Sequence, residues 1–177
     1  VVKVTDIRVR DIRFPTSKDN LGTDAVHVDC DYSATYVTII TDNKNLTGIG
    51  LTFTIGKGND LCCKAIEFFK EFIVDKEIRD IEENILEIWT KVTNHSQLRW
   101  VGPNKGVTHL AAAAFFNAIW DLISKFYNKP LWQYIVDLDT DSLINKLSFN
   151  YLDDVITKEE AKKIVNSNKE KLPKDTS

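Results

Sequence analysis

The sequence contains no methionine and only three cysteines, Cys30 and the adjacent pair Cys62 and Cys63. This number and spacing argue against a disulfide framework or a CxxC metal site, so we interpret the cysteines as buried thiols in a reducing compartment. Since even an initiator methionine is missing, we expect Val1 to be a processed end or the edge of a fragment. The formal net charge is −3 and Lys and Arg form no long run, which argues against a nucleic-acid partner.

Long uncharged apolar stretches are also missing from the sequence. The nearest, Leu110 to Trp120, contains Asn117 and is shorter than the roughly 18 residues of a membrane span. Val1 to Arg10 alternates apolar and charged residues and has no apolar core of a secretory peptide. We therefore expect an intracellular protein, mitochondrial or cytoplasmic, without a membrane partner.

Three runs near the N-terminus have the period of β-strands: Lys3 to Phe14, Ser33 to Thr41 and residues 49–55. The parity of the apolar residues shifts within the first run, which predicts a bulge. Asp42 to Asn45 supplies turn residues before the third run. In that run Ile, Leu and Phe alternate with Gly and Thr, as in a half-buried strand whose large residues face the core. Together the runs predict an antiparallel meander.

From Gly58 onward the apolar period becomes helical. We predict one helix directly after Gly58 and a second that begins near Asp80, a capping residue. A third, over Val107 to Tyr127, is apolar nearly all round, so we expect it to be buried and Asn117 and Asp121 to need partners. The apolar stripes of the first two helices are Leu61, Ala65, Phe68, Phe69 and Phe72, widened by Cys62, Ile66 and Ile73, and then Ile81, Ile85, Ile88, Trp89 and Val92.

A new unit is predicted after residues 137–141. Lys146 to Leu152 alternates apolar and polar residues as a strand does. Thr157 to Glu160 is a capping box that opens a helix. The whole pattern predicts an α+β fold, with a three-stranded antiparallel meander and a helical bundle over residues 1–140 and a strand followed by a helix over 146–177.

The clearest functional feature is a 17-residue polar loop, Thr16 to Tyr32, between the first two strands. A hairpin needs only two to five residues, and long loops on rigid strands commonly bind ligands. His27, Asp29 and Asp31 alternate, so in an extended backbone they would share one side and could hold a cation. The alternative, which we favour, is a solvated loop whose carboxylates cap local turns.

Other patterns of catalytic chemistry are weak. Gly56-Lys57-Gly58 could receive an anion between a strand and a helix, but it is not a phosphate loop, and helix entry explains it better. The histidines lack zincin spacing, and no Gly-x-Ser-x-Gly elbow is present.

The residues that carry a family resemblance lie in the long loop, at the end of the third strand and around the start of the third helix. There the sequence closely resembles the enolase superfamily and, within it, the L-fuconate dehydratase group. The matching residues are Arg13-Phe14-Pro15-Thr16-Ser17, Gly22, Asp24-Ala25, His27, Asp29, Asp31-Tyr32-Ser33, Thr52-Phe53-Thr54, Gly56-Lys57-Gly58, Gln97-Leu98-Arg99-Trp100-Val101-Gly102-Pro103-Asn104-Lys105-Gly106-Val107, His109-Leu110-Ala111, Asn117-Ala118 and Trp120-Asp121-Leu122.

The resemblance implies an N-terminal α+β capping domain followed by a modified TIM barrel, of which Lys146 to Leu152 would be the first strand. It also implies dehydration of a sugar acid, such as L-fuconate to 2-keto-3-deoxy-L-fuconate. In that reaction a base removes the proton α to the carboxylate, Mg²⁺ stabilises the enediolate and the β-hydroxyl leaves.

By the same resemblance, Gly22, Thr23, Asp24 and Tyr32 occupy positions where the family's loop contacts the acid sugar. Relatives often have Ala where this sequence has Thr23, so its backbone is the safer contact. His27, Asp29 and Trp100 are weaker candidates near the same site.

The family's catalytic residues and metal ligands lie in the barrel, which takes roughly 200 residues or more. The resemblance therefore implies no catalytic residue and no metal ligand in this chain, with Mg²⁺ bound by the absent barrel, and an inactive chain by itself. Two alternatives stay open: a noncatalytic binding or regulatory module, and a related dehydratase for another acid sugar. The expected partner of the complete enzyme is a small-molecule acid sugar, and a homo-oligomer also stays open.

Overall fold

A computed structural model describes residues 1–102 and 106–169. Residues 103–105 of the matched Gly-Pro-Asn-Lys-Gly motif and residues 170–177 of the predicted second unit lie outside the described residues. The chain divides into two compact units, Val1–Leu131 and Trp132–Ser177. The predicted domain limits, 1–140 and 146–177, stay a prediction.

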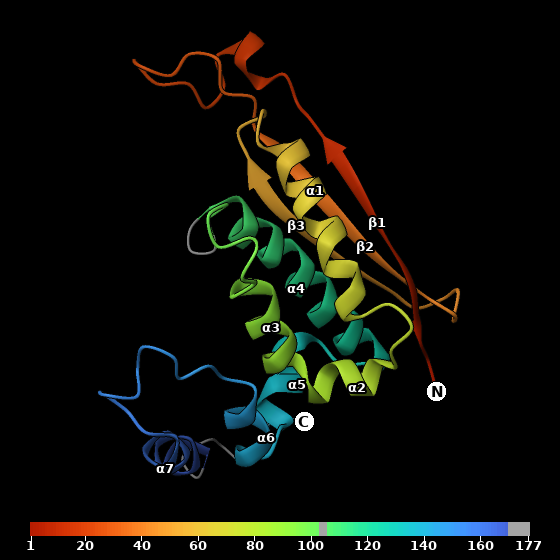
Figure 1. The fold of residues 1–177 in the computed structure, drawn as a ribbon, viewed down its shortest axis with the longest axis vertical. Helices are drawn as coiled ribbons and strands as arrows, with labels where there is room; N and C mark the ends of the chain where they lie inside the picture. The colour runs from red at the N-terminus through yellow and green to blue at the C-terminus, as the bar shows by residue number, and fades with distance from the viewer. Residues whose placement is uncertain (103–105, 170–177) are drawn as a thin grey trace. The chain divides into compact units, whose positions relative to one another are not determined.

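The first unit is built on a three-stranded antiparallel sheet in the order β1-β2-β3. The predicted meander is confirmed, and so is the bulge, since the register of β1 against β2 shifts between Val4 and Asp6. Helices α1 and α4 pack on one face of the sheet (Figure 1). The elements are β1 (Val4–Ile12), η1 (Thr16–Asp19), β2 (Ser33–Thr41), β3 (Thr47–Thr54), α1 (Asn59–Phe69), η2 (Lys70–Phe72), α2 (Ile78–Glu83), α3 (Ile85–Thr93) and α4 (Val107–Phe126).

The two faces of β3 are the reverse of the sequence prediction. Ile49, Leu51 and Phe53 are 49%, 43% and 50% exposed, whereas the small residues between them are buried. A Cβ atom on Gly50 would lie 2.2 Å from the carbonyl oxygen of Ala114 in α4. Glycine therefore allows the helix backbone to approach the sheet more closely than any larger residue would.

Helix α1 forms where predicted, but its buried stripe is rotated from the predicted one. Leu61 and Phe68 are each 57% exposed. The buried residues are Asn59, Cys62, Ala65, Ile66 and Phe69. Burial raises the pKa of the Cys62 thiol to about 11, so the predicted buried thiol is confirmed at this position. Cys30 and Cys63 are only partly buried.

The second predicted helix is two helices, α2 and α3, separated at Asn84. The side-chain amide of Asn84 donates a hydrogen bond to the carbonyl oxygen of Asp80 at 2.9 Å and ends α2 there. Since α2 begins at Ile78, Asp80 lies in its first turn and is not the capping residue. The predicted stripe is otherwise confirmed, because Ile81, Ile85, Ile88 and Val92 are buried and Trp89 is partly buried.

Helix α4 is the central helix of this unit. By length and composition it could cross a bilayer, but 61% of its 18-residue apolar window is buried within the protein. Asn117 is exposed, contrary to the prediction, because it lies on a stripe with Leu110 and Lys125 that no neighbouring element covers. Asp121 has partners, as predicted: its carboxylate accepts hydrogen bonds from the Ile49 amide at 2.7 Å and from Lys125 Nζ at 2.6 Å.

The second unit contains α5 (Leu131–Asp137), α6 (Thr140–Asn145) and α7 (Lys158–Lys169). The predicted capping box is confirmed, since the Glu160 carboxylate accepts from the Thr157 amide at 2.8 Å and the Thr157 hydroxyl accepts from the Glu160 amide at 3.2 Å. The strand predicted over Lys146 to Leu152 is not formed; this segment consists of bends and turns, and Tyr151 is 87% exposed. A barrel strand is held by hydrogen bonds to parallel neighbours, and the described part of this unit contains no other strand to supply them.

Candidate functional site

The loop between β1 and β2 extends beyond the end of the sheet, and its two ends are tied together (Figure 1). The Thr16 hydroxyl accepts a hydrogen bond from the Tyr32 amide at 2.9 Å and donates to the carbonyl oxygen of Cys30 at 3.1 Å. The Asp31 carboxylate accepts from the Ser17 hydroxyl at 2.8 Å and from the Ser17 amide at 3.2 Å. These two bonds lower the pKa of Asp31, because they favour its charged form.

Two of the predicted contact residues, Gly22 and Tyr32, are in direct contact. The Tyr32 hydroxyl donates to the carbonyl oxygen of Gly22 at 3.2 Å. Gly22 has φ +75°, and a Cβ atom there would lie 1.9 Å from Cε2 of the Tyr32 ring, so the turn requires glycine. The ring itself lies 5.2 Å from that of Phe53, which connects the loop to β3.

The other two predicted residues, Thr23 and Asp24, use their side chains to hold the turn. The Thr23 hydroxyl donates to the carbonyl oxygen of Asn20 at 3.1 Å. Asp24 Oδ1 accepts from the amides of His27 at 2.7 Å and Val26 at 2.8 Å, and these bonds, His27 first, lower its pKa. Both side chains are therefore engaged within the loop, and the backbone is what remains at these positions for an incoming ligand.

His27, Asp29 and Asp31 all line one hollow of about 520 Å³, but their side chains do not converge on a common point. The His27 imidazole lies 3.2 Å from Asp24, and Asp31 is bonded to Ser17. In the described ranges, 1–102 and 106–169, no group of three or more His, Cys, Asp or Glu residues could hold a metal ion. These residues do not fit a magnesium site, so we derive no chemical step through a metal from them.

The same hollow contains two basic residues that were not among the predicted contacts, Arg13 and Lys57. The Arg13 guanidinium lies 2.8 Å from Asp11 and 3.5 Å from Asp60, and the bond to Asp11 raises its pKa. Lys57 belongs to the Gly-Lys-Gly sequence at the entry to α1, which is the only pattern that could have indicated it. None of Gly22, Thr23, Asp24 and Tyr32 lines this hollow, so the loop has two separate surfaces.

Asn59, the first residue of α1, joins the three strands beneath the loop and is fully buried. Its side-chain amide donates to Asp11 Oδ1 at 2.8 Å, to the carbonyl oxygen of Ala34 at 3.0 Å and to that of Ile12 at 3.2 Å. Its side-chain oxygen accepts from the Thr54 hydroxyl at 2.6 Å. Sequence reasoning missed this residue, because a polar side chain at a helix start is usually read as a cap.

An apolar hollow of about 480 Å³ adjoins the loop, where the end of β3 meets the starts of α1 and α4. Phe53, Ile55 and Leu61 line it and are all at least half exposed. Trp100 is not among its lining residues and is 87% exposed, with the Arg99 guanidinium 5.8 Å from its ring.

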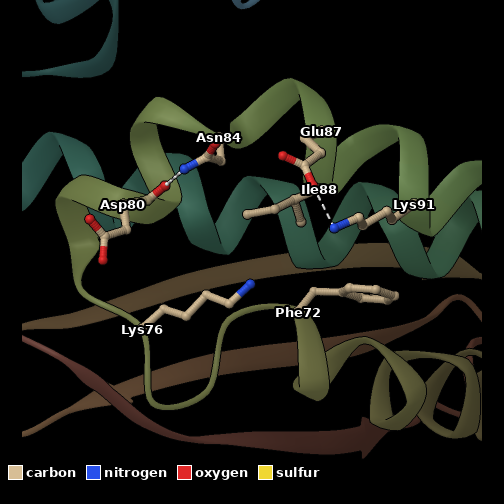
Figure 2. Close-up of a pocket in the computed structure, with 7 residues that line it drawn as sticks. All are labelled: Phe72, Lys76, Asp80, Asn84, Glu87, Ile88 and Lys91. Carbon is tan, nitrogen blue, oxygen red and sulfur yellow. Dashed lines mark hydrogen bonds and ion pairs between the residues drawn. The ribbon is translucent and has the colours of Figure 1, made fainter.

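Figure 2 shows a further hollow, of about 400 Å³, between Phe72 and the helices α2 and α3. Lys76 reaches into it from one side, while Glu87 and Lys91 form an ion pair at 2.5 Å on the other. Asp80 lies at its edge. Because acidic and basic groups alternate around it, this hollow does not select a ligand of either charge, and we assign no function to it.

Comparison with known proteins gives the fold and loop their context. No family model matches the sequence. Mitochondrial enolase superfamily member 1 of Xenopus laevis is 44% identical over 95% of this chain and 38% of its own length. The crystal structure of the human protein of that name superposes with a TM-score of 0.86 at 42% identity, over 93% of this chain and 38% of that chain. The chain belongs to the enolase superfamily.

L-galactonate dehydratase of Hypocrea jecorina is likewise 44% identical to this superfamily member, over 90% of the chain and 35% of its own length. L-talarate dehydratase from Polaromonas sp., solved with Mg and L-glucarate, superposes with a TM-score of 0.56 at 14% identity, over 82% of this chain and 40% of that chain, and shows the fold alone. These matches confirm the α+β capping fold. The chain spans 35% to 38% of the length of the sequence relatives named here.

Proposed function

We propose that this chain is the substrate-contacting cap of an acid-sugar dehydratase, a hydro-lyase that converts L-fuconate to 2-keto-3-deoxy-L-fuconate. The observation that carries this proposal is the 44% identity to an L-galactonate dehydratase over 90% of the chain. The family of dehydratases and racemases is shown by the relatives, whereas the substrate is our inference.

The loop supports this proposal through the groups that it leaves available. Thr23 and Asp24 hold the turn with their side chains, so their backbone groups and that of Gly22 would contact the sugar acid. The Tyr32 hydroxyl donates to Gly22 and can still accept a bond from a sugar hydroxyl. Tyr32 is 40% exposed, so a ligand can reach it.

The choice of L-fuconate over L-galactonate rests on the apolar tip of the loop. The two acids differ only in that L-fuconate has a methyl group where L-galactonate has a hydroxymethyl group. Leu21, Val26 and Val28 are 59%, 80% and 65% exposed near the proposed contacts. Apolar side chains favour the methyl group, although a pocket of this kind rejects an added hydroxyl by only about a hundredfold at most.

The Mg²⁺ ion and the base of this reaction class would be held outside this chain. Solved enolase-superfamily structures contain Mg, including a racemase from Streptomyces coelicolor with bound magnesium. A barrel that carries such groups takes roughly 200 residues or more, so we propose that residues 1–177 alone do not turn over an acid sugar. We also propose an intracellular protein, in mitochondria or cytoplasm, because its relatives are named mitochondrial.

The test is an assay of the complete protein with Mg²⁺ and either L-fuconate or L-galactonate, measuring the 2-keto-3-deoxy product. We expect turnover of L-fuconate, and we expect Tyr32→Phe to lower kcat/KM about tenfold. Tyr36→Phe, which removes the same hydroxyl from β2, should leave it unchanged. No turnover of any acid sugar would overturn the dehydratase and favour a noncatalytic module, and equal effects of the two variants would overturn the contact at Tyr32.

A further inference from the structure

A basic hollow lies on the face of the sheet opposite the helices, toward the turn that joins β2 and β3. Its volume is about 270 Å³. Because β1 leads into the 13–32 loop at the other end of the sheet, this hollow is separate from the loop and from the acid-sugar proposal (Figure 1). It is lined by Arg8, Arg10, Thr38, Ile40, Thr41, Asn43, Lys44 and Thr47.

The charged residues of this basic hollow, Arg8, Arg10 and Lys44, all have the same sign. Within the ranges that the structure describes, none of their side chains has a hydrogen bond or ion pair, whereas other basic residues on the same strand end are paired, such as Arg13 with Asp11. Arg8 and Arg10 are two residues apart on one face of β1, so roughly 7 Å separates them and they repel each other. In a chain of net charge −3, three unpaired cations around one depression need an explanation.

The turn beside the hollow is held in one conformation, which positions Lys44. The Thr41 hydroxyl lies 2.9 Å and 2.8 Å from the carbonyl oxygens of Asn43 and Leu46, and it accepts from the Asn43 amide at 3.2 Å. Asn43 Oδ1 accepts from the Asn45 amide at 3.1 Å, and the NH₂ group of Asn43 supplies a donor at the rim. The site thus combines cations on a strand with donors on an ordered turn.

We propose that the basic hollow binds the phosphate group of a small soluble molecule. Arginine forks bind phosphate oxygens in pairs, and three cations balance the two to three charges of a phosphate monoester or pyrophosphate, whereas a carboxylate has only one. Most sites for drug-sized ligands are roughly 300 to 1,000 Å³, so a hollow of this size suits one or two phosphoryl groups with the rest of the ligand outside.

Protection of a strand edge and dimerisation both account for less of this geometry. Basic residues protect an edge strand such as β1 from pairing with another chain, but this needs neither Lys44 nor a hollow. A symmetric dimer through this surface would place the hollow's cations near those of its copy, and no acidic residue lines it to pair with them.

The proposal is tested by titrating the complete protein with inorganic pyrophosphate at constant ionic strength and following backbone amide shifts by NMR. We expect saturable shifts at residues 8–10 and 38–47, with affinity reduced about tenfold by each of Arg8→Gln, Arg10→Gln and Lys44→Gln. Arg79→Gln, a matched change on α2, should leave the affinity unchanged. Acetate should cause no saturable shift.

A second arm uses phosphatidylcholine vesicles with and without phosphatidylglycerol, which separates a lipid headgroup from a soluble phosphate. Pyrophosphate binding that the three variants reduce, without vesicle binding, supports the proposal. Binding to anionic vesicles alone would overturn the assignment to a soluble ligand. Shifts that do not saturate, or that Arg79→Gln reduces equally, would overturn the site itself.

Discussion

The two faces of the three-stranded sheet differ in what completes them. On the inner face, Gly50 lies against α4 and Asn59 joins the strands, while on the outer face Ile49, Leu51 and Phe53 are about half exposed. Every buried side-chain nitrogen and oxygen in the described part of the chain has a hydrogen-bond partner, but Arg8 and Arg10 on the outer face do not. The inner face is completed by the domain itself, and the outer face is open to a ligand.

This difference shows that hydrophobicity alone does not choose the buried face of a strand. Burying Ile49, Leu51 and Phe53 would remove more apolar surface from water than burying two glycines and two threonines. The close approach of α4 and the complete hydrogen bonding around Asn59 compensate for that loss. Changes to the inner face should therefore be costly where equivalent changes elsewhere are not.

The largest effect is expected for Gly50→Ala. A Cβ atom there would lie 2.2 Å from the Ala114 carbonyl oxygen and 2.5 Å from the Ala118 amide nitrogen, so the helix must move away from the sheet. We expect the free energy of unfolding to fall by at least about 3 kcal/mol in urea titrations. Gly58→Ala is the control, because its nearest neighbour is Thr54 at 3.9 Å and we expect a change within about 1 kcal/mol.

Leu51→Thr, on the outer face, sharpens the same comparison and should change the free energy of unfolding by less than about 1 kcal/mol. Equal losses in Gly50→Ala and Leu51→Thr would show that the two faces do not differ as described.

The next largest effect is expected for Asn59→Ala. The substitution leaves the Thr54 hydroxyl and the carbonyl oxygens of Ile12 and Ala34 without their buried partner. We expect a loss of about 3 kcal/mol in the free energy of unfolding. Asn84→Ala removes one exposed bond to Asp80 and should cost less than about 1 kcal/mol, so similar losses in both would contradict the role of Asn59.

The smallest effect is expected from acid on the loop. The pKa of Asp31 is lowered in the folded state by bonds from Ser17, so these contacts stabilise the loop above the ordinary pKa of Asp and are lost as pH falls through the folded value. Hydrogen-exchange protection of the Ser17 amide should decrease between about pH 4 and about pH 2. Protection in Asp31→Asn should show no such decrease, and a parallel decrease in both would assign the effect to another group.

Most of the elements were predictable from local patterns in the sequence. The period-2 runs located the three strands, the shift of parity located the bulge, and Thr157 to Glu160 located the start of α7. The loop was also predictable, because 17 residues exceed what a hairpin needs. The contact of Tyr32 with Gly22 could not be predicted, since ten residues separate them and only the folded loop brings them together.

The predictions that failed depend on neighbours that a local pattern does not show. The rotated stripe of α1 and the exposed side of α4 follow from which helix faces are covered. Lys146 to Leu152 has the alternation of a strand but lacks neighbouring strands in the described residues, so its backbone turns instead.

The sequence by itself determined the type and order of the elements of the capping domain, the long loop and the resemblance to the enolase superfamily, because these depend on residues close together in the chain. Only the tertiary structure decided that β3 buries its glycines, that Asn59 holds the strands together and that Arg8, Arg10 and Lys44 surround one hollow. The physical reason is that burial and charge pairing depend on which surfaces approach each other, and that approach is set by packing between elements distant in sequence.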